Sequence, residues 1–160
     1  MCLITVAPQG VGKKVSDLES FIRNGMFSND DGSGIAWKQF SQDNTNTIHL
    51  KKGFKTATDL LSYIEKIDLK EEDELIIHHR IGTSGLKNEI NMHPFIVTSN
   101  LDILNSTEGE FNLPAICHNG IFYKYNVGTD IYSDTHNFVR GFISDENILN
   151  ILKKIGRAHV

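Results

Sequence analysis

The 160-residue sequence has few of the features that build disulfide-stapled or membrane-spanning proteins. Its only two cysteines, Cys2 and Cys117, allow one bridge but no disulfide framework. No apolar run approaches the ~20 residues that a transmembrane helix needs. The apolar residues 3–7 lack the basic lead and the length of a secretory signal. We therefore expect a cytoplasmic protein with no membrane partner.

Positive charge is also scarce. Sixteen Lys and Arg residues stand against 20 Asp and Glu residues, which gives a formal net charge of −4. The basic pairs, such as Lys13-Lys14 and Lys51-Lys52, are scattered along the chain and form no stripe. Because nucleic-acid binding depends on clustered Lys and Arg side chains that neutralise phosphates, we expect no nucleic-acid partner.

Short strand and helix patterns alternate irregularly along the chain. Strand patterns cover residues 3–7, 35–37, 45–51 and 74–81, and helical patterns cover residues 15–26, 58–67, 138–142 and 148–155. This irregular order indicates an α+β fold with mainly antiparallel strands. The length and composition predict a single domain over residues 1–160.

Local signals add three finer predictions. Ser16 and Glu19 have the spacing of a capping box at the start of a helix. The Asn119-Gly120 pair, between two short apolar runs at 115–117 and 121–123, predicts a β-hairpin. Residues 98–112 are polar and without periodicity, which indicates a lid or a disordered excursion.

Cys2 is the first residue with a chemical signature. If Met1 is trimmed, Cys2 carries a thiol and a free α-amine in one residue. The α-amine has an unperturbed pKa of ~7.7–8.0, so it can act as the general base for a neighbouring thiol at neutral pH. The alternative interpretation is that Cys2 is a small buried apolar side chain.

Three polar segments further along the chain are the other candidates. Arg80, at the end of a predicted strand, can hold a carboxylate through two parallel hydrogen bonds, or can pair with a surface acid. Asn119 and Gly120 can donate to one oxyanion, or can form a plain turn. Asp134, before a helical pattern, can bind an ammonium group, or can belong to an N-cap.

Taken in chain order, these segments resemble the class II glutamine amidotransferases. The matching segments are Cys2, His79-Arg80-Ile81-Gly82-Thr83-Ser84-Gly85, Asn91-Met92-His93-Pro94, His118-Asn119-Gly120 and Ser133-Asp134-Thr135. Gly85 follows Arg80 by five positions and His93 follows it by 13, and both intervals resemble those of the family. Members of that family are N-terminal-nucleophile hydrolases with a four-layer αββα sandwich, so the resemblance implies that fold.

The resemblance implies a reaction. Cys2 would attack the side-chain amide of glutamine, with its own α-amine accepting the thiol proton. The Asn119 side chain and the Gly120 amide would hold the oxyanion. Glutamate and ammonia would be the products, released by a stand-alone enzyme or delivered to a separate acceptor subunit.

The resemblance also implies a substrate-binding set. Arg80 would bind the α-carboxylate of glutamine and Asp134 its α-ammonium group, while Thr83 and His93 would shape the pocket. No cofactor and no metal ion take part in this chemistry.

Some positions depart from the family pattern. Ile81 and Ser84 stand where the family often has an aromatic residue and a histidine. Only 25 residues follow Thr135, and their pattern is helical, so we expect either a minimal or a C-terminally truncated sandwich.

Three alternatives remain open at this point. The chain could hydrolyse a different amide, such as another γ-glutamyl compound, or it could be an inactive relative of the fold. It could also be a structural zinc module, because several soft or borderline ligands occur together: His78, His79, His93, Cys117 and His118. His78 and His79 are adjacent in a strand pattern and point to opposite faces, so at most one of them would serve a given metal site.

Overall fold

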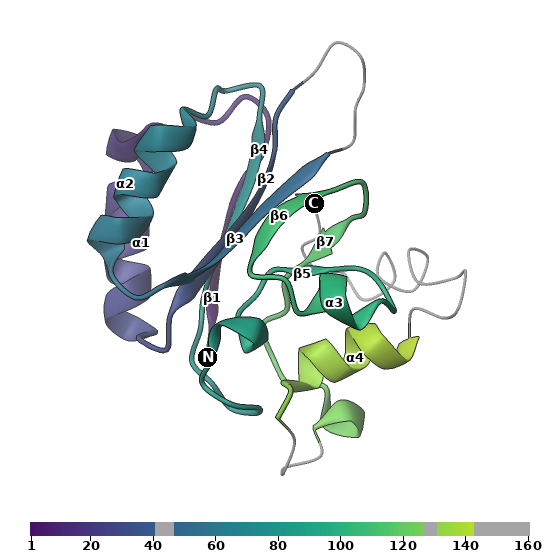
Figure 1. The fold of residues 1–160 in the computed structure, drawn as a ribbon. Helices are drawn as coiled ribbons and strands as arrows, with labels where there is room; N and C mark the ends of the chain where they lie inside the picture. The colour runs from purple at the N-terminus through teal and green to yellow at the C-terminus, as the bar shows by residue number, and fades with distance from the viewer. Residues whose placement is uncertain (41–46, 127–130, 143–160) are drawn as a thin grey trace.

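A five-stranded antiparallel sheet forms the centre of the computed structural model, which describes residues 1–40, 47–126 and 131–142 (Figure 1). The strand order is β1-β4-β2-β3-β6, and every neighbouring pair is antiparallel. The strands are β1 (Leu3–Ala7), β2 (Ser33–Lys38), β3 (Ile48–Phe54), β4 (Glu74–His79) and β6 (Glu108–Phe111). Strand β4 lies between β1 and β2, and His79 at its C-terminal end is fully buried.

Helices α1 (Val15–Ser28) and α2 (Ala57–Ile67) cover one face of this sheet (Figure 1). Side chains alternate between the two faces of a strand, so Leu75 and Ile77 of β4 point toward these helices. They pack against apolar residues at helical spacing, among them Leu18 and Ile22 of α1. Burial of such side chains contributes about 1.5–3 kcal/mol each and fixes the helices on the sheet.

A second, two-stranded sheet covers the opposite face. It consists of β5 (Phe95–Ile96) and β7 (Ala115–Ile116), which pair antiparallel. Ile96 and Ala115 contact the main sheet, in one cluster with Ile76 of β4. Phe95 and Ile116 point away from the main sheet, in the direction that the alternation of side chains requires.

Two further helices pack on the outer side of the small sheet. They are α3 (Leu101–Leu104) and α4 (Asp134–Phe142), and Phe138 and Val139 of α4 join the cluster of Phe95 and Ile116. Short 3₁₀ helices occur at η1 (Glu89–Asn91) and η2 (Tyr123–Tyr125). The described residues therefore form four layers, helices, sheet, sheet and helices, with one apolar cluster between each pair (Figure 1). The prediction of an α+β fold with mainly antiparallel strands is confirmed.

The capping box predicted at Ser16 and Glu19 is wrong. Helix α1 has Lys14 as its N-cap, and the Asp17 carboxylate accepts a hydrogen bond from the Lys14 amide at 3.0 Å. Asp17 stands three residues after Lys14 and satisfies a backbone donor at the helix entry. Ser16 therefore lies inside the first turn and has no capping role.

The predicted hairpin around Asn119-Gly120 is also wrong. The first of its two runs pairs with β5, far earlier in the chain, and residues 121–123 form no strand. The Phe122 amide instead donates to a carboxylate oxygen of Asp134 at 2.5 Å. Phe122 also stacks on Phe138 of α4, with ring centroids 4.2 Å apart. These contacts turn the chain toward α4 and away from a hairpin partner.

Residues 98–112, predicted as a lid or a disordered excursion, form α3 and β6 instead. The Asn100 side chain caps α3 by accepting from the amides of Asp102 and Ile103. β6 pairs with β3 and forms one edge of the main sheet, where Lys51 pairs with Glu108. An edge strand with polar side chains shows no apolar periodicity, which is why the sequence pattern did not indicate it. The helix predicted over residues 148–155 lies outside the described residues.

Candidate active site

Cys2 immediately precedes the edge strand β1. The antiparallel register pairs Leu3 with His79, so Cys2 lies beside the residues that follow β4. Its Sγ atom is 3.4 Å from both the backbone nitrogen and the backbone oxygen of Ile81. The thiol is partly exposed, whereas the second cysteine, Cys117, is buried between the sheets.

Arg80 follows β4 directly and is buried, with 3% of its surface exposed. Its guanidinium group donates to the carbonyl oxygens of Leu86 at 3.1 Å and Ser84 at 2.9 Å. Its backbone amide donates to the Gly32 carbonyl at 2.9 Å. Burial lowers the pKa of Arg80, and the Asp31 carboxylate opposes this shift. The side chain therefore organises the loop 80–86 and presents a cation beside Cys2.

Asp134 is the first residue of α4. Ser133, the residue before it, accepts a hydrogen bond from the His136 amide at 3.2 Å, as an N-cap does. One Asp134 carboxylate oxygen accepts from the Ser84 hydroxyl at 3.0 Å, and the other accepts from the Phe122 amide. The N-cap interpretation therefore applies to Ser133, while the Asp134 carboxylate faces the neighbouring loops through Ser84 and Phe122.

These segments meet around one small hollow of about 20 Å³. That volume is room for about one water molecule. The lining residues come from separate parts of the chain: Cys2, Arg80, Ile81, Thr83, Ser84, His93, His118, Gly120, Ser133, Asp134 and Thr135.

Six of the seven residues singled out in the sequence therefore line the same hollow, namely Cys2, Arg80, Thr83, His93, Gly120 and Asp134. The seventh, Asn119, does not line it and is exposed to solvent. Its neighbour Gly120 has a φ of +141°, a conformation that favours glycine.

His93 forms the inner wall of the hollow. Its ring lies 4.2 Å from the ring of His78, centroid to centroid, and edge-on to Phe95 at 4.8 Å. Burial, and then the neighbouring His78, hold the pKa of His93 well below its usual range, so the ring is neutral at pH 7. Among the described residues, neither ring nitrogen of His93 has a hydrogen-bond partner.

The histidines do not assemble into a metal centre among the described residues. Within those residues, no three His, Cys, Asp or Glu side chains are arranged to hold a metal ion. His78 and His79 point to opposite faces of the sheet, as their adjacency predicts. His78 contacts His93, whereas His79 lies 2.6 Å from the Ser33 hydroxyl and faces Gly25 of α1.

Asn91 is a residue of this site to which the sequence patterns assigned no role. Its side-chain amide nitrogen donates to the carbonyls of Leu86 at 3.0 Å and Ile131 at 2.7 Å. Its side-chain oxygen accepts from the Ser133 amide at 2.7 Å. Asn91 is fully buried and joins the Arg80 loop to the start of α4. Only its place in the segment 91–94 indicated that it belongs to the site.

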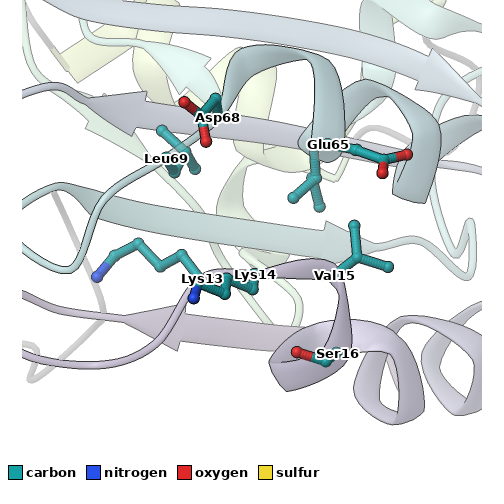
Figure 2. Close-up of a pocket in the computed structure, with 8 residues that line it drawn as sticks. Lys13, Lys14, Val15, Ser16, Glu65, Asp68 and Leu69 are labelled. Atoms are coloured by element: carbon teal, nitrogen blue, oxygen red, sulfur yellow. The ribbon is translucent and has the colours of Figure 1, made fainter.

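A larger hollow of about 330 Å³ lies at the far end of β1 from Cys2, between the start of α1 and the end of α2 (Figure 2). Its lining mixes charged and apolar side chains, including Lys13, Lys14, Glu65 and Asp68 (Figure 2). The Lys13 ammonium already donates to three backbone carbonyls, of Pro8, Val11 and Glu71. Lys13 therefore holds these loops together.

In the part of the chain that the structure describes, no helix is both long enough and apolar enough to cross a membrane. Neither models of known protein families nor the sequences of curated proteins match this chain.

Proposed function

We propose that this chain hydrolyses the side-chain amide of glutamine, with Cys2 as the nucleophile, as in the class II glutamine amidotransferases that its motifs resemble. The observation that carries the proposal is the convergence of Cys2, Arg80, Gly120 and Asp134 from four distant segments on one hollow. The four layers of the fold support the same proposal, because they match the layer order of an N-terminal-nucleophile hydrolase sandwich. We propose a cytoplasmic enzyme that releases ammonia or delivers it to a separate acceptor subunit.

The charges around the thiol suit a free amino acid. The Arg80 guanidinium offers donors to a carboxylate, and the Asp134 carboxylate offers acceptors to an ammonium group. Without substrate, each group is anchored by contacts to loops 80–86 and 118–122. An α-amino acid carries both charges on one carbon, which such a pair recognises together.

The reaction begins when the α-amine of Cys2 accepts the thiol proton through a water molecule. The sulfur then bonds to the amide carbon of glutamine, and the carbonyl electron pair moves to oxygen. The Gly120 amide donates a hydrogen bond to this oxyanion, whereas the Asn119 side chain would have to turn inward from solvent to contribute a second donor. As the C–N bond breaks, the leaving nitrogen takes the proton back from the ammonium and departs as ammonia. Water then cleaves the thioester, which releases glutamate and restores the thiol.

The mechanism requires removal of Met1, because a peptide bond to Met1 occupies the amine. Met1 is 94% exposed, so its loss removes no packing from the core. Methionine is normally trimmed when the next residue is small, as Cys2 is.

The small size of the hollow implies a movement on binding. Its volume of about 20 Å³ excludes a glutamine molecule, so the lining loops must separate as the substrate enters. The loop 80–86 is joined to α4 by hydrogen bonds such as that between Ser84 and Asp134, which would have to break as the loop moves.

The test is the intact mass of the natively expressed protein, before and after treatment with 6-diazo-5-oxo-norleucine, a glutamine-like electrophile. We expect a mass without Met1 and a single adduct that maps to Cys2. Cys2→Ala removes the adduct, and Cys117→Ala, which keeps the nucleophile, is the matched control. Glutamate release from glutamine is then compared with release from other γ-glutamyl amides.

Each contrary outcome has a distinct meaning. A retained Met1, or a trimmed chain that takes up no label, excludes this mechanism and indicates an inactive relative of the fold. If the labelled chain prefers another γ-glutamyl amide, Cys2 is still the nucleophile, but glutamine is not the preferred substrate.

A further inference from the structure

Asp31 does not line the hollow, but it contacts residues 80–82. This short segment contains Arg80 and the Ile81 backbone that contacts the Cys2 sulfur. Asp31 belongs to the turn before β2, in a segment whose Gly-rich composition indicates only a turn. One of its carboxylate oxygens accepts from the Gly82 amide at 2.6 Å. The side chain is nearly buried, with 10% of its surface exposed.

The backbone of the same turn reinforces this contact. The Asp31 amide donates to the Arg80 carbonyl at 3.2 Å, and the Arg80 amide donates to the Gly32 carbonyl at 2.9 Å. These bonds hold residues 80–82, immediately after β4, against the turn that contains Asp31. Ile81, in the middle of that stretch, contacts the Cys2 sulfur through its backbone.

The carboxylate also lies close to the Arg80 guanidinium. A Cβ atom built on Gly82 would be 3.1 Å from a terminal nitrogen of Arg80 and 3.3 Å from the Asp31 oxygen. The absence of a side chain at Gly82 therefore lets the cation and the carboxylate approach the same backbone. The other Asp31 oxygen pairs with Lys87, an exposed side chain, at 2.7 Å.

We infer that Asp31 is a positioning residue for the reaction, which sets the place of the Ile81 backbone under the thiol and of the Arg80 guanidinium beside it. The inference rests on the proposed function. The positioning role belongs to the hydrogen bond that the Asp31 carboxylate accepts from the Gly82 amide. The Lys87 end of the ion pair is exposed to solvent, and an ion pair with such a partner contributes little to stability.

Two substitutions separate the hydrogen bond from the charge. Asp31→Ala removes the acceptor for the Gly82 amide, and we expect kcat/KM for glutamine to fall roughly 10- to 100-fold, because small misplacements of reacting groups have effects of that size. Asp31→Asn keeps an acceptor oxygen and is expected to stay within about 3-fold of the wild type. Lys87→Ala, the matched control, removes only the exposed ion pair and is expected to behave like the wild type. Rates are divided by the fraction of chains that take up the Cys2 label, which corrects for unfolded protein.

Hydrogen exchange provides a readout that does not need enzyme activity. We expect Asp31→Ala to accelerate exchange of the Gly82 amide about 10-fold or more, while amides of β2 and β3 keep their protection. Asp31→Asn and Lys87→Ala are expected to leave the Gly82 amide protected. If the wild type lacks glutaminase activity, the proposed function fails, and this exchange pattern alone decides the positioning role.

Two results would overturn the inference. One is an Asp31→Ala protein with wild-type turnover, or, in an inactive chain, with wild-type exchange at Gly82. The other is an Asp31→Asn protein as impaired as Asp31→Ala, which would assign the effect to the negative charge.

Discussion

The Ser84 hydroxyl group donates a hydrogen bond to the Asp134 carboxylate and accepts one from the Asp134 amide, both at 3.0 Å. The carbonyl oxygen of the same serine accepts from the Arg80 guanidinium. Ser84 therefore connects the cation and the anion of the proposed substrate site. In the sequence it stands out only as a departure from the amidotransferase pattern, at a place where a histidine is common.

Replacing Ser84 tests this connection. Ser84→Ala removes both side-chain hydrogen bonds to Asp134, and bonds to charged groups contribute about 1.5–3 kcal/mol. We expect the KM for glutamine to rise roughly 10-fold or more, with a smaller change in kcat, because in the proposed mechanism Asp134 binds the substrate and takes no part in bond breaking. Steady-state glutaminase kinetics provide the measurement. Ser106→Ala, which removes a surface hydroxyl bonded to the Asp102 carbonyl, is the control, and an unchanged KM in Ser84→Ala would contradict the connection.

The two thiols are expected to differ sharply in reactivity. Cys117 is 1% exposed, and burial raises the pKa of its thiol, whereas Cys2 is partly exposed. Iodoacetamide should therefore modify Cys2 alone in the native protein and both cysteines in denaturant. Peptide mass mapping checks this, with Cys2→Ser as the unlabelled control. Modification of Cys117 under native conditions would contradict the buried position between the sheets.

Acid should destabilise the protein through its buried histidines. Burial, with a smaller contribution from neighbouring His79, lowers the pKa of His78 to about 3, and burial lowers that of His79 to about 4. In the unfolded chain both groups titrate near 6.5, so below that pH the unfolded state binds more protons than the folded state. The free energy of unfolding should fall from pH 6.5 toward pH 4, by up to about 1.4 kcal/mol per pH unit for each histidine.

Urea unfolding at pH 7, 6 and 5 measures this slope. His79→Gln removes one of the titrating groups and is expected to reduce the slope by about 1.4 kcal/mol per pH unit. A free energy of unfolding that stays constant from pH 6.5 to 5 would show that these rings are not buried as described.

Two helical glycines are expected to respond oppositely to alanine. A Cβ atom at Gly25 of α1 would lie 2.3 Å from the ring of buried His79, so Gly25→Ala forces the helix and β4 apart. We expect it to destabilise the protein by about 1–3 kcal/mol, since overpacking outweighs the gain in helix propensity. At Gly141 of α4 the nearest atom among the described residues, on Tyr125, is 3.5 Å away, which is an ordinary contact. Gly141→Ala should stabilise by up to about 1 kcal/mol.

Thermal and chemical unfolding of the two variants side by side test this contrast. A Gly25→Ala protein as stable as the wild type would mean that α1 does not pack on β4 at this position.

The local elements of the fold were predictable from the sequence because each depends on neighbouring residues. The pattern of apolar residues predicted β1, β4, α1 and α2 to within a few residues, since periodicity reports which face of an element is buried. The motifs likewise indicated Cys2, Arg80 and Asp134 as a set. They could not place the exposed Asn119, whose orientation depends on the loop around it.

Tertiary structure decided the features that depend on distant partners. β7 pairs with Phe95–Ile96 and not with residues 121–123. In this pairing the side chains of β5 and β7 are buried between the main sheet and α4. The polar strand β6 exists because β3 offers an open edge, which no local pattern records. Asp31 accepts a hydrogen bond from Gly82, which is 51 positions away in the sequence, and Asn91 accepts one from Ser133, which is 42 positions away. Such contacts form only when the chain has folded, so the sequence by itself determined the elements and the candidate residues, and the packing of the layers decided how those residues meet.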